Sequence, residues 1–290
     1  GNIDNKTDAR ILDNAVINAG DDISVTADGV VVDRNDAYVG AAGLVGLGAA
    51  YAELDSDNNI VARVGNGSTI GSGDRITVAA TLDSTLNAQA HGGAVGAGAA
   101  GAAIARVIES GTSQAYVGNN VDIGQGDDLV GDLFIDANVI IDADADTVGV
   151  AVGIGAASVN SASIDLSPWV SAYIGTGSAV TVQGDVDIAS SVIINALSDG
   201  TGAAIGGVGV GAMLASISVG RGDNNSEIQA GVASTVVINA ATVRIDARSQ
   251  HDLLATSTAG GGGVAAGLAG ASSSILNDNS VRTYMGFGAS

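Results

Sequence analysis

The chain has no cysteine and a single proline, Pro168, in 290 residues. Without cysteine it can form neither disulfide bridges nor thiolate metal sites. The 44 glycines follow no strict period of three and lack accompanying prolines, which excludes a collagen-like triple helix. The longest apolar run, residues 148–157, is too short and too rich in glycine for a transmembrane helix. Stability must therefore come from packing and from backbone hydrogen bonds.

Lysine and glutamate are also scarce: Lys6 is the only lysine, and glutamate occurs only at Glu53, Glu109 and Glu227. Helix surfaces favour these two residue types, so their scarcity argues against a helical protein. With 10 basic and 31 acidic residues the net charge is −21. Binding to nucleic acid or to an anionic membrane requires clustered cations. We therefore expect no nucleic-acid partner and no membrane insertion.

Aromatic residues make up only 3% of the chain, yet 46% of its residues are hydrophobic and the mean hydropathy is +0.36. A disordered acidic segment would be far less apolar, so the chain should fold. Because small and β-branched side chains dominate, any core must be thin and must lie between sheets. The composition predicts an all-β protein.

A short string recurs along the whole chain, at intervals of about 55 residues. It is clearest as Ala-Tyr-Val-Gly at 115–118 and Ala-Tyr-Ile-Gly at 172–175. The position of its glycine marks each copy: Asp13 (in place of glycine), Gly65, Gly118, Gly175, Gly231 and Gly286. A turn with a β-alternating run and then a Gly/Ala tract follow each marker in phase. The chain 1–290 is thus predicted to be a single repeat domain, with units 9–61, 62–114, 115–171, 172–227 and 228–282 and a sixth starting at 283–290.

Inside a unit, apolar residues recur with a period of two, as in residues 148–154, where one face is Val and Ile and the other is Gly and Ala. This pattern favours strands over an Ala-rich helix, because interleaved glycines destabilise a helix by about 1 kcal/mol each. Repeats that cannot bury their apolar face alone must stack, so we predict a parallel β-helix-like β-solenoid of five repeats. If one unit forms one coil, five units would rise only about 24 Å. The Gly/Ala face suits either a thin core or a tight lateral contact between molecules.

The pattern resembles the Ala/Gly-rich repeats of giant bacterial surface proteins, the filamentous or leukotoxin-type adhesins. The elements that carry the resemblance are 172–175, the run Gly-Asp-Val-Asp-Ile at 184–188 and the tract 206–212. The resemblance implies an exported, cell-surface or extracellular β-solenoid that forms a stiff stalk or fibre in attachment or biofilm matrix. It implies no catalytic residues. Because the chain begins and ends in mid-pattern, without an initiator Met or a signal peptide, we expect either a segment of a longer array or a processed filament subunit.

Acidic, turn-like segments offer the oxygen ligands that calcium prefers. The calcium candidates are Asp55, Asp57, Asp127, Asp128 and Asp223. Their spacing does not match the nonapeptide calcium repeat, so solvated turns are the favoured interpretation and no cofactor is expected. The integrin-type tripeptide 221–223 is easily met by chance in such a chain. His91 and His251 lie at different distances from their markers, so no histidine metal site is expected.

Two other groups of residues stand out. Tyr116, Tyr173 and Tyr284 recur at one phase and are predicted to stack as a structural ladder. Pro168 and Trp169 interrupt the repeat and predict an irregular exposed loop that could contact a ligand.

The leading hypothesis is a non-enzymatic extracellular structural segment of a bacterial adhesin or filament. Its partners would be copies of itself, packed end to end or laterally, and a host or matrix surface ligand. The alternative is a β-helix protein that binds glycans or degrades a polysaccharide. Such an enzyme needs a unique cluster of functional groups, and only the segment around Trp169 approaches one.

Overall fold

The computed structural model describes residues 1–125, 130–220 and 226–290, and within these residues the fold is all-β. The strands are β1 (Asn2–Ile11), β2 (Val16–Asn18), β3 (Ile23–Ala42), β4 (Val45–Val64), β5 (Thr69–Glu109), β6 (Thr112–Val117), β7 (Asp122–Ile123), β8 (Val130–Leu166), β9 (Trp169–Ile174), β10 (Ala179–Thr181), β11 (Asp185–Val219), β12 (Ser226–Val232), β13 (Val237–Asn239), β14 (Thr242–Asn277) and β15 (Asn279–Met285). No helix long and apolar enough to cross a membrane occurs among the described residues.

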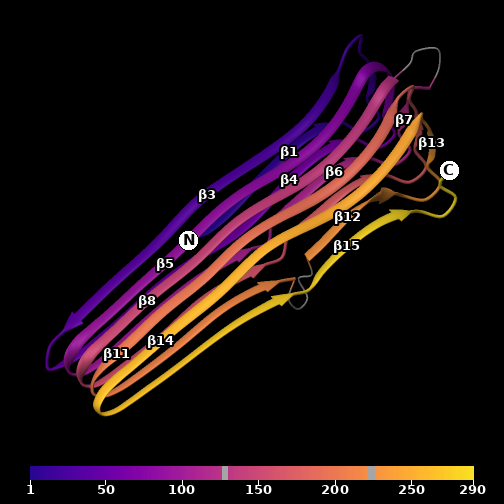
Figure 1. The fold of residues 1–290 in the computed structure, drawn as a ribbon. Coiled ribbons are helices and arrows are strands. Elements are labelled where there is room, and N and C mark those ends of the chain that lie inside the picture. The colour runs from indigo at the N-terminus through magenta and orange to yellow at the C-terminus, as the bar shows by residue number, and fades with distance from the viewer. Residues whose placement is uncertain (126–129, 221–225) are drawn as a thin grey trace.

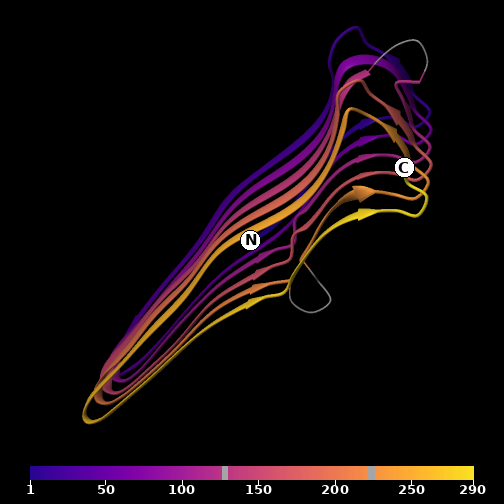
Figure 2. The same ribbon diagram turned by 45° about the vertical axis from the view of Figure 1, so that its right-hand side comes forward.

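Successive units pair in parallel and form a β-solenoid, which confirms the predicted fold class (Figure 1). In each coil the chain runs out along one long arm, reverses, and returns along a second arm that lies behind the first (Figure 2). We call these the outbound and return arms; in the first coil they are β3 and β4. In later coils β5, β8, β11 and β14 each contain both arms. The return arm leads into a marker strand, a turn and a short strand before the next coil starts.

The pairing register shows that one unit forms one coil. Ile23 pairs with Ile76, an offset of 53 residues, whereas Ile76 pairs with Leu133, an offset of 57. The change falls across residues 126–129, and a similar change, from 53 to 58, falls across residues 221–225. The basic repeat is therefore a coil of 53 residues, and a few extra residues lengthen some of the coils.

The register corrects two of the marker positions. Ile11 pairs with Val64, so Leu12, and not Asp13, is equivalent to Gly65. Val232 pairs with Ile174, so Ala233 takes the place of the marker glycine in that coil. Gly231 was mistaken for the marker because it lies two residues earlier, opposite Tyr173. Sequence identity alone does not distinguish such slips of one or two residues.

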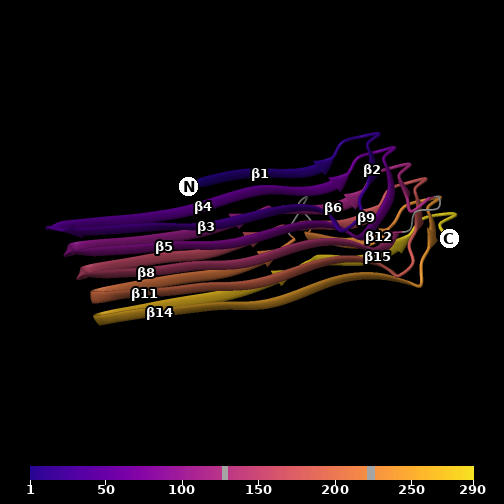
Figure 3. The ribbon, with the colours of Figure 1, turned by 90° about the horizontal axis from the view of Figure 1, so that it is seen from above.

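Each coil is far wider than it is tall. An arm such as β3 has 20 residues and is about 65 Å long, while five stacked coils rise about 24 Å. The molecule is consequently a flattened blade whose strands run along its long dimension (Figure 3).

We call the end that carries the marker strands and turns the body. Its interior follows the usual rule, with large aliphatic side chains packed between the arms. Ile76, Leu82, Leu133 and Ile135 are at most 1% exposed. Burial of such side chains stabilises by about 1.5–3 kcal/mol each, so the body supplies most of the hydrophobic stabilisation.

The opposite end, where the chain reverses, we call the tip; it lies at the lower left in Figure 1. It comprises residues 37–52, 92–105, 147–164, 200–220 and 253–277, which contain no charged residue. Its interior contains a separate cluster formed only of alanines, such as Ala94 and Ala151. A Cβ added at Gly92 would collide with the carbonyl oxygen of Ala102 on the facing arm, and one added at Gly46 would lie 2.7 Å from the carbonyl oxygen of Val95. The glycines thus face inward and produce a thin core, while valine and isoleucine face solvent.

The turn after each marker strand is built from one backbone conformation. Gly67 and Gly177 have φ values of 66° and 72°, and Asn14, Asn120 and Thr235 occupy the same place with φ of 58°, 53° and 59°. Gly and Asn tolerate this left-handed conformation, which explains the Gly and Asn of the recurring string.

Candidate functional site

The outer side of the outbound arms carries a row of carboxylates and amides, which we call the acidic face. The sequence Asp-Ala-Asp-Ala-Asp at 142–146 explains how it arises: strand alternation buries Ala143 and Ala145 and turns Asp142, Asp144 and Asp146 outward. In the next coil, Asn195, Leu197 and Asp199 lie directly beside these aspartates.

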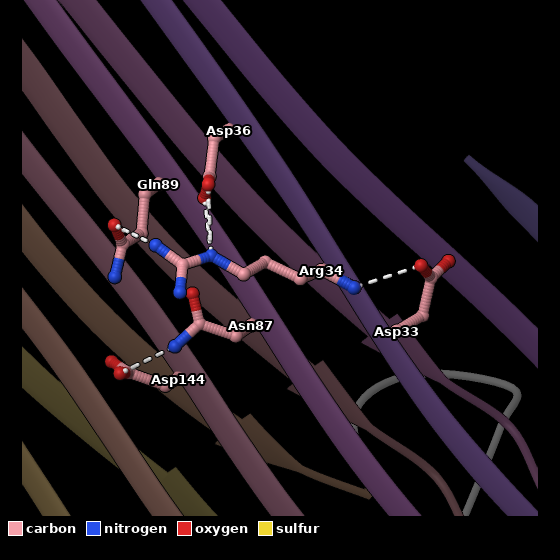
Figure 4. Close-up of polar contacts among 6 residues, drawn as sticks. All are labelled: Asp33, Arg34, Asp36, Asn87, Gln89 and Asp144. Carbon is pink, nitrogen blue, oxygen red and sulfur yellow. Dashed lines mark hydrogen bonds and ion pairs between the residues drawn. The ribbon is translucent and has the colours of Figure 1, made fainter.

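Side chains of the acidic face are joined from coil to coil (Figure 4). Asn87 donates a 3.0 Å hydrogen bond to Asp144, as Figure 4 shows. Asn195 donates a 2.7 Å hydrogen bond to Asp142. Arg34 pairs with Asp36 at 2.8 Å and also donates to Gln89 in the next coil. The contacts of Asn87, Asn195 and Gln89 tie adjacent coils together, whereas the Arg34–Asp36 pair lies within β3. On the surface each is worth little alone.

The carboxylates of the acidic face are held close to one another. Partial burial raises the pKa of Asp144, and repulsion from Asp146 and Asp199 adds to the increase. Burial likewise raises the pKa of Asp146, while His91 opposes the increase. A groove of about 490 Å³ opens here. Its lining includes Asn87, Asp142, Asp144, Asn195, Leu197, Asp252 and Leu254. Such a surface can donate and accept hydrogen bonds and attract cations.

A buried carboxyl group lies inside the body, at Glu109. The side chain is 0% exposed, and Ser84 donates a 3.1 Å hydrogen bond to its Oε2, whereas Oε1 has no hydrogen-bond partner in the structure. Burial raises the pKa of Glu109 to about 7. Glu109 was not among the site residues predicted from the sequence. Alternation in the run Ala103, Ala105, Val107, Glu109 would have found it, because the first three residues occupy inward positions.

Two of the three predicted ladder tyrosines are in direct contact. The rings of Tyr116 and Tyr173 are 4.8 Å apart and within 4° of parallel. The following coil places Gly231 beside Tyr173, and Tyr284 comes after Gly231. All three tyrosines share one register column, but Gly231 interrupts it. Burial raises the pKa of Tyr173 to about 12, and the neighbouring Tyr116 adds to the increase.

The predicted acidic turn at residues 55–59 is wrong. Residues 55–59 lie within strand β4, with Asp55 and Asp57 facing outward and Ser56 and Asn58 buried. Asp127, Asp128 and Asp223, together with the tripeptide 221–223, lie outside the described residues. Within the described ranges, no group of three or more histidine or carboxylate side chains is placed to hold a metal ion.

The histidines occupy different environments. His91 stacks on Tyr38, with ring centroids 4.8 Å apart. His251 lies in the last coil, within hydrogen-bonding distance of Asn277 (2.8 Å) and Ser249 (2.7 Å), and burial lowers its pKa.

Pro168 and Trp169 do not form the irregular loop that we expected. Pro168 is buried, and strand β9 begins at Trp169, which pairs in register with Thr112 and Glu227. The backbone therefore continues the solenoid through this segment. The indole is 37% exposed on the outer surface.

Comparison of the chain with protein-family models, with curated proteins and with solved structures finds no match in any of the three.

Proposed function

We propose that this chain is a structural segment of an extracellular bacterial fibre, in which solenoids stack end to end. The observation that carries the proposal is an open strand edge at each end, together with a core that is uncovered at the last coil. Strand β3 pairs only with β5, and β14 only with β11, among the described residues. At the last coil the inward-facing Val243 is 43% exposed. Open strand edges above an uncovered core favour the addition of another coil.

Charges at the two ends support stacking in the same parallel register. Asp28 heads a column that continues through Thr81, Asn138 and Ser191 to Arg248. A second copy that stacked with its β3 on β14 would place its Asp28 beside Arg248. Its β1 would be displaced in such a contact, because β15 already fills that level of the marker-strand column. The Arg248 side chain pairs with Asp246 and is 68% exposed, which leaves room for a further carboxylate partner. Head-to-tail contacts of this kind do not close and so generate filaments.

The dimensions favour a ribbon over a long stalk. Each coil consumes at least 53 residues and adds about 4.8 Å along the solenoid axis. A long stalk built in this way would need many residues for little length, whereas the blade-like coils present a wide surface. Matrix building and surface presentation in a biofilm, as in the adhesins that the sequence resembles, therefore suit the geometry better than reach.

Mass per length measured by scanning transmission electron microscopy tests the proposal. A chain of 28.0 kDa that rises about 24 Å gives about 1.2 kDa per Å for a single ribbon. Arg248→Glu should abolish filaments through repulsion by Asp28, and the double variant R248E/D28R should restore them. Filaments unaffected by R248E, or a folded wild type that remains discrete at every concentration, would overturn the proposal.

The groove on the acidic face supports a second candidate function, glycan binding. It combines amide and carboxylate groups with two exposed leucines, Leu197 (40%) and Leu254 (54%). Titration of soluble polysaccharide fragments into the wild type and into Asp142→Asn tests it. Binding that weakens in the variant supports glycan recognition here, and no binding to either protein contradicts it.

A further inference from the structure

We infer that the outer surface of the return arms at the tip is a lateral docking surface for a second copy of this chain. We call it the return face. It includes Leu47, Ile104, Val159, Val210, Leu214 and Leu268, whose exposed fractions lie between 40% and 70%. They come from five successive coils, which lie side by side in Figure 1.

The return face is apolar because the tip inverts the usual arrangement of side chains. On β11, Gly209 and Gly211 face the thin core, and Val210 between them faces solvent. A shift of one residue would place Val210 inside, but the facing backbone leaves no room for it. Large aliphatic side chains are thus displayed systematically in coil after coil, rather than scattered singly over the surface. Contiguous apolar surfaces of this size generally mark an interaction site.

The charge distribution points to a second copy as the occupant. All of the charged residues that give the net charge of −21 lie outside the tip. Two copies that met through their bodies would bring rows of carboxylates together. Contact through the tips avoids this repulsion, which is weak beyond about 10 Å at moderate ionic strength.

The area of the return face is sufficient for a stable pair. Eight residues of each return arm extend about 26 Å, and five coils rise about 24 Å, which gives about 630 Å² per copy. A face-to-face pair would therefore bury about 1,260 Å², above the roughly 1,000 Å² expected of a specific interface. In the register column of Val210, the small Ala157 and Ala100 lie between the bulky Val210 and Leu47. Large and small side chains on one face allow two identical faces to interdigitate about a two-fold axis.

Lateral pairing is independent of end-to-end stacking, because the return face lies on the flat side of the blade and the open strands lie at its ends. The experiment uses R248E, which blocks stacking, as the background. Sedimentation velocity should then show a mass that saturates at twice 28.0 kDa as concentration rises. In the wild type, ribbons should pair, and their mass per length should double to about 2.3 kDa per Å.

Two charge-insertion variants separate the return face from the rest of the tip. V159E/V210E adds two carboxylates to the return face, at side chains 56% and 40% exposed. V150E/I205E adds the same two charges to the outbound side of the tip, at side chains 38% and 54% exposed, again at diagonal neighbours on β8 and β11 that are offset by two residues. Dissociation of the pair should require at least tenfold higher dilution for V150E/I205E than for V159E/V210E. Circular dichroism checks that both variants fold.

Three outcomes would overturn the inference. The first is a monomer at every concentration in the R248E background, and the second is a dimer that both variants weaken equally. The third is flotation of the chain with neutral phosphatidylcholine vesicles that V159E/V210E abolishes, without any dimer, which would make lipid the occupant. A wild type that forms the dimer but no filaments at any concentration would instead refute only end-to-end stacking.

Discussion

The body and the tip share one backbone ladder but use side chains in opposite ways. In the body, Leu133 and Ile135 fill the space between the arms, and carboxylates face solvent. In the tip, glycine and alanine lie between the arms, and Val152 and Ile154 face solvent, 39% and 74% exposed. Both arrangements satisfy the same strand alternation. The comparison teaches that a parallel ladder tolerates either face inward, and that the size of the inward side chains sets the separation of the sheets.

The largest expected effect contrasts two residues of β8. Leu133→Ala creates a cavity in the body and should lower the free energy of unfolding by about 4 kcal/mol. Ile154 in the tip is mostly exposed to solvent, so Ile154→Ala removes little buried apolar surface. Its expected cost is below about 0.5 kcal/mol. Urea unfolding of both variants followed by circular dichroism measures the difference. Equal losses would mean that the tip buries Ile154 in an assembly or that the body is not the main core.

The second prediction concerns the one carboxyl group buried in the body, among the described residues. The folded-state pKa of Glu109 is raised to about 7 from its ordinary value of 4.5, so between these values the folded state binds more protons than the unfolded state. Stability should therefore fall as pH rises from 4.5 to 7, by up to about 3 kcal/mol from this group, and then level off.

Glu109→Gln isolates that contribution from the surface carboxylates. The variant should match the wild type near pH 4.5 and be more stable by as much as about 3 kcal/mol at pH 8. Thermal unfolding across this pH range provides the measurement. A stability difference that does not depend on pH would show that Glu109 titrates normally.

The third prediction tests whether glycine in the tip provides space. Gly92→Ala places a methyl group against the Ala102 carbonyl and should cost about 2 kcal/mol through overpacking. Gly93→Ala, one residue later on the outer side, meets only the Val39 carbonyl oxygen at 3.9 Å and should be neutral or slightly stabilising. Denaturant midpoints of the two variants decide the matter. Similar midpoints would contradict the thin core.

Much of this fold could be predicted from composition and periodicity. Scarce Glu and Lys, alternation and the recurring string led to a parallel β-solenoid, and the pairing of β8 with β11 confirms it. The number of coils per unit could not be predicted, because it depends on where the chain reverses. It was also impossible to predict which face of residues 148–154 points inward. Alternation reveals two faces but does not tell which one contacts the opposite arm.

The site was less accessible to sequence reasoning. The acidic turn at Asp55 failed because Asp and Asn also fit outward strand positions when the neighbouring residues are buried. The expected loop at Trp169 failed because proline can occupy a break between strands without disturbing register. The acidic face depends on pairs such as Asn87 with Asp144, which are 57 residues apart and meet only through the register.

The smallest predicted effect concerns the second use of glycine. In the tip glycine provides space, whereas in the turns of the body it provides conformational freedom. Thr235 occupies the left-handed turn position with φ of 59°, where Gly67 and Gly177 stand in other coils. A β-branched residue is strained there, so Thr235→Gly should stabilise the chain by about 1 kcal/mol or less, after the loss of backbone entropy is subtracted. Asn120→Gly, at the equivalent turn, serves as control and should change stability by only a few tenths of a kcal/mol, because asparagine tolerates this conformation. A destabilised Thr235→Gly in thermal unfolding would mean that the 2.7 Å hydrogen bond from the Thr235 hydroxyl to the Ser234 carbonyl outweighs the strain.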